Sequence, residues 1–97
     1  MNPAPKQIGG ANVICYAVIT SEIKPTGGCR QIVAGVLQGP ASALTICQYD
    51  GESSFYLFGC DEQWQEATDT CHETLEDAKH QAEFEYAGVS NVWQQVS

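Results

Sequence analysis

The stretch DTCHETLEDAKH, residues 69–80, gathers the side chains of this sequence that most resemble a reactive or metal-binding cluster. Cys71 stands beside His72, acidic residues surround the pair, and His80 closes the stretch. A thiol next to an imidazole is a pairing used in nucleophilic catalysis, and imidazoles with carboxylates are common metal ligands. Neighbouring residues of an extended strand point to opposite faces, so Cys71 and His72 are not expected to act together.

A metal or cofactor site is not indicated by the remaining motifs. Glu76, His80 and Glu83 follow at helical spacing and share one face of a helix, but they lack the paired histidines of an HExxH motif. We interpret them as a solvated charged face. The chain has no CxxC motif, phosphate-binding glycine loop or nucleophile elbow. We therefore predict no catalytic residues, no metal, no cofactor and no enzyme activity.

The elements that position these side chains are short strands followed by one helix. Turn residues separate several β-branched, apolar segments, and Asp50-Gly51 is the strongest hairpin signal. The predicted strands are residues 11–20, 31–38, 43–49, 53–60 and 64–71. We expect residues 1–11 to form a flexible arm and residues 12–97 a single domain. The predicted fold is α+β: an antiparallel meander sheet of about five strands, packed on one face by a single C-terminal helix.

The helix is predicted over residues 75–87. Thr74 is a good N-cap with Asp77 three residues later, and Gly88 is well placed to end the helix. An apolar stripe faces the core and comprises Leu75, Ala78, Ala82, Tyr86 and Val89. Phe84 lies on the opposite, polar face, so we expect it to contact either Trp93 of the C-terminal tail or a second subunit.

Strand alternation divides the sheet into two faces. With a two-residue turn at Asp50-Gly51 and a three-residue turn at residues 61–63, Cys47 is predicted to pair with Ser54, and Phe58 with Glu66. The face expected under the helix holds Leu44, Ile46, Phe55, Leu57, Ala67 and Cys71. The other face holds the candidate binding residues Tyr49, Tyr56, Phe58, Trp64 and Glu66, with Thr45, Cys47, Cys60 and Thr68. One helix cannot cover both faces, so N-terminal strands, a second subunit or a ligand covers this aromatic face.

Charge limits the partners of the protein. The net charge is −8, and residues 50–97 hold eleven of the twelve acids with Lys79 as their one lysine or arginine. Such a surface repels phosphate backbones, which argues against nucleic acid, and it suits a basic protein or a cationic small molecule. No apolar run is long enough to cross a membrane, and the N-terminus has no signal-peptide pattern. Five cysteines without paired spacing favour free thiols and a cytoplasmic location.

A resemblance covers residues 46–87, which contain the segments YDG, FYLF, CDEQW, DTCHETLEDA and QAEFEY. These segments resemble small uncharacterised bacterial proteins of the kind carried on mobile elements such as integron gene cassettes. The resemblance implies a small α+β fold and assigns no catalytic residue. We predict a non-enzymatic interaction module, homodimeric through the aromatic sheet face or the helix face of Phe84, with Phe84 and Trp93 as the candidate interface residues. The alternatives are a small-molecule binding protein and an acidic antagonist of a basic protein.

Overall fold

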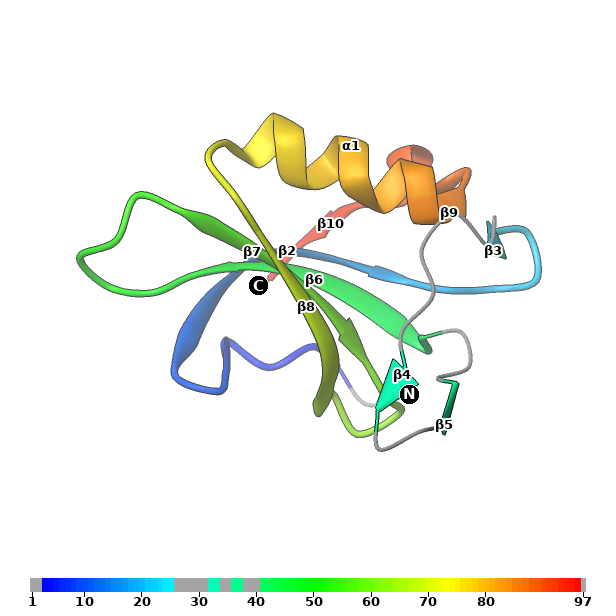
Figure 1. The fold of residues 1–97 in the computed structure, drawn as a ribbon, viewed down its shortest axis with the longest axis horizontal. Helices are drawn as coiled ribbons and strands as arrows, with labels where there is room; N and C mark the ends of the chain where they lie inside the picture. Colours follow the sequence, from blue (N-terminus) through cyan, green and yellow to red (C-terminus); the bar gives the residue numbers. More distant parts are fainter. Residues whose placement is uncertain (1–2, 26–31, 34–35, 38–40, 97) are drawn as a thin grey trace.

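The computed structural model describes residues 3–25, 32–33, 36–37 and 41–96, and within them one α-helix packs on a curved antiparallel sheet (Figure 1). The sheet order is β1-β2-β6-β7-β8, and β10 pairs with β2 on the same side as β1. Its strands are β1 (Gln7–Ile8), β2 (Ala11–Val18), β6 (Ala43–Gln48), β7 (Phe55–Cys60), β8 (Glu66–His72) and β10 (Gln94–Gln95). The predicted α+β fold, a meander with a C-terminal helix on one face, is confirmed.

Strand β1 lies inside the segment predicted as a flexible arm. Ile8 pairs with Ala11 across a two-residue turn, Gly9-Gly10, in which both residues have positive φ. Such turns match the twist of a hairpin and favour glycine. Ile8 is 6% exposed because it packs in an apolar cluster of the sheet. From Gln7 onward the structure therefore differs from the prediction.

The predicted strand over residues 31–38 is also different. Its described residues form β4 (Ile32–Val33) and β5 (Val36–Leu37), which pair with each other as antiparallel strands outside the main sheet. A second small ladder joins β3 (Lys24–Pro25) to β9 (Tyr86–Ala87). The rest of residues 31–38, and residues 26–29 of the preceding loop, lie outside the described residues.

Helix α1 (Leu75–Glu85) begins as predicted. The Thr74 hydroxyl accepts a hydrogen bond from the backbone N–H of Asp77 at 3.0 Å, which satisfies one of the free donors at the helix start. Ala78 and Ala82 are fully buried against the sheet. The helix ends two residues earlier than predicted because Tyr86 joins β9. In the described ranges no helix is long and apolar enough to span a membrane.

The side chain of Glu83 fixes the chain after the helix. Its carboxylate accepts hydrogen bonds from the backbone N–H groups of Gly88 (2.9 Å) and Ser90 (3.0 Å). These bonds hold the pKa of Glu83 below its usual range, because they stabilise the ionised form. Gly88, at φ 96°, leads into the 3-10 helix η1 (Val89–Asn91), and Val89 is fully buried.

The first hairpin keeps the predicted faces in spite of a different register. The backbone N–H of Glu52 bonds to the carbonyl of Tyr49, so Asp50-Gly51 is the centre of a turn as predicted. Cys47, however, pairs with Tyr56 and not with Ser54. The displacement is two residues, and an even displacement leaves every side chain on its predicted face.

The second hairpin has a longer connection than the predicted three-residue turn. As a result, several β8 side chains lie on the opposite face from the one predicted. Phe58 pairs with Asp69 and not with Glu66, a displacement of three residues. The odd displacement moves Cys71 from the helix side to the face of Phe58, where it is exposed, and moves Thr68 to the helix side. Ala67 is the extra residue of a bulge, since Gly59 pairs with Thr68 and Cys60 with Glu66. It is exposed and not in the core as predicted.

The turn itself explains the longer connection. The Asp61 carboxylate accepts hydrogen bonds from the backbone N–H groups of Gln63 and Gln65, both at 2.9 Å. Trp64 takes a left-handed backbone conformation at φ 64° and points inward, with 6% of its surface exposed. Positive φ is rare for a bulky residue, so a prediction from turn propensities does not anticipate it.

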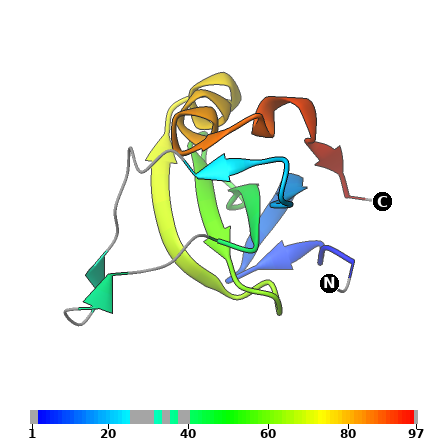
Figure 2. The same ribbon diagram turned by 90° about the vertical axis from the view of Figure 1, so that its right-hand side faces the viewer.

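Two apolar cores lie on the two sides of the sheet. The helix-side core contains Cys15, Ala17, Ile23, Leu44, Ile46, Leu57, Ala78, Ala82, Tyr86 and Val89. The second core contains Ile8, Ala11, Ala43, Cys47, Phe58, Cys60 and Trp64. In Figure 2 the helix lies at the top, and the dark blue N-terminal strand, which belongs to the same curled sheet, lies at the lower right. The sheet therefore curves around the second core, and β1 and the start of β2 help to enclose it.

Candidate functional site

The aromatic face predicted from the sequence lies largely inside the protomer. Phe58 is 1% exposed and Trp64 is 6% exposed, both in the second core. Tyr16 of β2 packs edge-on against Trp64, with ring centroids 5.6 Å apart. Ile8 and Ala11 belong to the same core, so the N-terminal strands cover this part of the aromatic face.

The two tyrosines of the set lie nearer the surface. Tyr49 and Tyr56 are half-buried and pack edge to face, with centroids 5.2 Å apart. The Tyr56 hydroxyl donates a hydrogen bond to Glu52 Oε1 at 2.9 Å. This bond to a carboxylate favours the protonated phenol and raises the pKa of Tyr56 to about 12. Tyr56 is therefore a neutral hydrogen-bond donor at neutral pH.

Glu66, the remaining predicted binding residue, is exposed at the start of β8. A Cβ atom on Gly9 would lie 3.0 Å from Glu66 Oε1, so this carboxylate sits beside the β1–β2 turn. The residues predicted as a dimer interface have different environments. Phe84 is 57% exposed on α1, whereas Trp93 is half-buried against the helix-side core with its indole Nε1 shielded from solvent.

The cluster at residues 69–80 is divided by the strand geometry. Cys71 pairs with Tyr56 and His72 with Phe55, so the two side chains leave β8 on opposite faces. His72 Nε2 lies 2.7 Å from the Thr70 hydroxyl, its neighbour on the same face. No group of three potential metal ligands occurs among the residues that the structure describes.

The buried thiols of the second core are held in their protonated form. Cys47 Sγ donates to the Thr45 hydroxyl at 3.4 Å, and Cys60 Sγ lies 3.8 Å from the same oxygen. Burial raises the pKa of both thiols to about 11. Since the thiolate is the nucleophile, these cysteines act as small apolar core residues at neutral pH.

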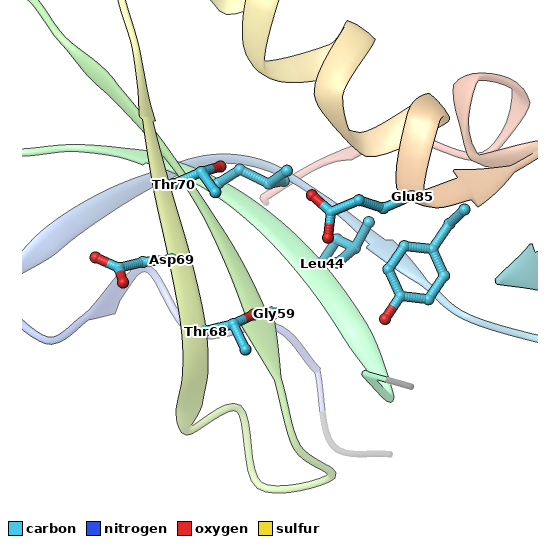
Figure 3. A pocket seen from close by; sticks show the side chains of 8 residues that line it. Leu44, Gly59, Thr68, Asp69, Thr70 and Glu85 are labelled. Atoms are coloured by element: carbon cyan, nitrogen blue, oxygen red, sulfur yellow. The ribbon is translucent and has the colours of Figure 1, made fainter. Parts of the chain in front are cut away.

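A small polar depression lies between β8 and the end of α1 (Figure 3). It is lined by Leu44, Leu57, Gly59, Thr68, Asp69, Thr70, Glu85 and Tyr86. Glu85 accepts a hydrogen bond from the Gln81 amide at 3.0 Å, and the Tyr86 hydroxyl accepts one from the backbone N–H of Ala41 at 2.7 Å. In Figure 3 the Glu85 carboxylate points toward Thr70, and the Asp69 carboxylate points away. The depression has room for about one water molecule, which is too little for an organic ligand.

The feature that the sequence analysis missed is the side of β8 that faces away from β7, here called the β8 edge. The two borders of the sheet differ. β1 and β10 both pair with the outer side of β2, whereas β8 ends the strand order and pairs only with β7 among the described strands. The position of β8 as the last strand of a meander was the available signal, because such a strand forms a border of its sheet.

Acidic side chains accompany this edge. Glu66 and Asp69 of β8 and Glu73, which follows the strand, are all exposed. Glu66 and Asp69 share a face although they are three residues apart, because the bulge at Ala67 adds one residue between them. Together these residues are called the β8 acids below.

Comparisons with protein-family models, with curated proteins and with solved structures give no match to this chain. The resemblance to bacterial gene-cassette proteins therefore stays a prediction. The functional argument depends on the geometry of the chain itself.

Proposed function

We propose that this protein is a non-enzymatic interaction module that binds an extended segment of a partner at the β8 edge. The observation that carries the proposal is that the two borders of the sheet differ in strand pairing. The chain uses two separate strands, β1 and β10, to pair with β2, and no described strand pairs with the seven-residue β8 on its outer side. An exposed strand border presents unpaired N–H and C=O groups and is a template for one more strand.

Strand addition is an established mode of peptide recognition in which main-chain hydrogen bonds give affinity and alternate side chains give specificity. β8 suits this mode because it is longer than an average strand and carries Thr68 and Thr70, whose β-branched side chains favour extended backbone. Its residues alternate between exposed and half-buried from Ala67 to His72, as expected of a strand at a border.

Two further observations favour a polypeptide partner over a small molecule. Phe58 and Trp64, which would have lined a ligand pocket, are used in the second core. The depression beside Glu85 accommodates about one water molecule. We place the protein in the cytoplasm, which is supported by the four described cysteines, all of which are free thiols.

Amide hydrogen exchange tests the proposal directly. In the free protein we expect alternate β8 amides, those directed away from β7, to exchange fast, because they have no partner strand. Extended synthetic peptides of basic, neutral and acidic composition are then added. At least one is expected to slow these amides, while β6, which is already paired on both sides, serves as an internal control. Unchanged β8 exchange with every peptide would overturn the proposal.

The homodimer predicted from the sequence is a separate proposal, supported by the exposure of Phe84 on the helix. Light scattering over a range of concentrations measures the oligomeric state. A dimer whose β8 amides still exchange fast would place the contact between copies elsewhere and leave the β8 edge available. A monomer at all concentrations would exclude the dimer.

A further inference from the structure

From the chemistry of the edge we infer that the partner segment is basic: an extended peptide that presents lysine or arginine at alternate positions toward the β8 acids. This inference rests on the proposed function, since it names the class of peptide that the β8 edge would bind. Three features support it: the face on which the β8 acids lie, the opposite face, where β8 itself carries no carboxylate, and the charge of the whole chain.

The first feature is the alignment produced by the bulge. Glu66 pairs with Cys60 and Asp69 with Phe58, so both carboxylates leave β8 on the side of the second core. A residue directly opposite on an added strand has its Cβ about 4.5–5.5 Å away on the same face. Because side chains on that strand also alternate, one basic residue in every two would lie on the face of these two carboxylates, of which that of Glu66 also lies beside Gly9 of the β1–β2 turn.

On the opposite face of β8, the partner segment would meet different side chains. Thr68, Thr70 and His72 lie on the helix side of the strand. None of the three carries a carboxylate, and the Thr70 hydroxyl is already within hydrogen-bond distance of His72. Because Glu66 and Asp69 lie on one face, the partner segment is proposed to carry its cations on that face, while small polar or β-branched residues suit the other. This arrangement defines an alternating pattern in place of a simple run of lysines.

Charge also favours such a partner over a second copy of this chain. Each copy has a net charge of −8, so two copies repel each other. In an antiparallel pairing centred on Asp69, the two Asp69 carboxylates would lie directly opposite, and like charges in that position are destabilising. Charged residues on border strands are a known protection against edge-to-edge association of identical chains. The same charges attract a basic strand.

The probe is a capped peptide of alternating lysine and threonine, with glutamate–threonine and serine–threonine versions as controls. Binding is measured by calorimetry at low ionic strength, and the site is located by amide exchange in β8. The lysine peptide is expected to bind at β8, with affinity that falls as salt is added. A lysine peptide N-methylated at alternate residues keeps its charge but loses donors for strand pairing, so it is expected to bind much more weakly.

Matched protein variants test the acids. Glu66→Gln combined with Asp69→Asn removes two charges at the edge, and we expect affinity for the lysine peptide to fall about threefold to tenfold. Glu22→Gln combined with Glu76→Gln removes two charges from other exposed positions and is expected to change it less than about twofold. Circular dichroism checks that both variants keep the fold.

The outcomes separate the two proposals. If the glutamate or serine peptide binds β8 as tightly as the lysine peptide, or if both variant pairs lose affinity equally, the inference fails and the proposed function stands. If no peptide slows β8 exchange, or if N-methylation has no effect, both fail. If β8 amides of the free protein become protected as its concentration rises, the occupant is a second copy, and the basic-partner inference is overturned.

Discussion

Replacing Gly59 with alanine tests a close contact between β7 and β8. Gly59 pairs with Thr68, and a Cβ atom at position 59 would lie 2.5 Å from Thr68 Oγ1. Ordinary contacts of a Cβ atom begin at 3.4 Å, so the hydroxyl has to move by about 0.9 Å, the difference between the two distances. Threonine has few χ1 choices, so relief requires a rotamer change or a shift of the strand. Overpacking of this kind costs about 1–3 kcal/mol.

Urea unfolding followed by tryptophan fluorescence measures the cost. We expect Gly59→Ala to lower the free energy of unfolding by about 1–3 kcal/mol, or the melting temperature by about 4–8 °C for each kcal/mol. In a Thr68→Ala background the nearest of the other contacts of that Cβ is Ala41 Cβ at 3.5 Å, so the same replacement should cost little. Thr68→Ser keeps the hydroxyl but frees its χ1 rotation, so the cost should fall between those in the wild-type and Thr68→Ala backgrounds. Equal costs in the wild-type and Thr68→Ala backgrounds, within about 0.5 kcal/mol, would refute the reasoning.

Three further predictions concern the helix ends and the thiols. Thr74→Ala should lower the free energy of unfolding by about 1 kcal/mol in thermal melts, and Thr74→Ser should retain most of it, because both hydroxyls cap α1. The lowered pKa of Glu83 means that its stabilisation is present above the ordinary glutamate pKa of about 4.3 and is lost as pH falls through the folded value. The stability deficit of Glu83→Gln should therefore shrink toward zero in acid, and a deficit independent of pH would contradict this. In a Cys29→Ser background, mass spectrometry after iodoacetamide treatment should find one adduct, at Cys71, since the other three thiols are buried; additional adducts on the folded protein would count against the predicted burial.

The helix shows how far local sequence signals reach. Thr74 caps α1, and Ala78 and Ala82 face the core, because capping and a 3.6-residue apolar period depend on residues close in sequence. The Asp50-Gly51 turn was predictable for the same reason. The end of the helix was less predictable, since Tyr86 leaves it to pair with Pro25, which is distant in the chain.

The sequence also separated the two faces of the central strands. Leu44 and Leu57 lie on the helix side and Phe58 on the other, because alternation survives an even change of register. The sequence did not reveal what covers the aromatic face. Ile8 belongs to a segment too short and too rich in glycine and proline to give a strand signal, yet it packs in the second core.

For the β8 edge, tertiary structure decided which side chains share a face. The residue types that make it acidic and β-branched are fixed by the sequence, and so is its place as the last strand before the helix. Which side chains share a face was decided by the left-handed backbone at Trp64 and the bulge at Ala67. The left-handed backbone at Trp64 places the indole in a core made of distant strands, so the energy of this turn is nonlocal. A change of one residue in such a connection moves every following side chain to the other face, and for that reason the sequence alone predicted the wrong face for Cys71.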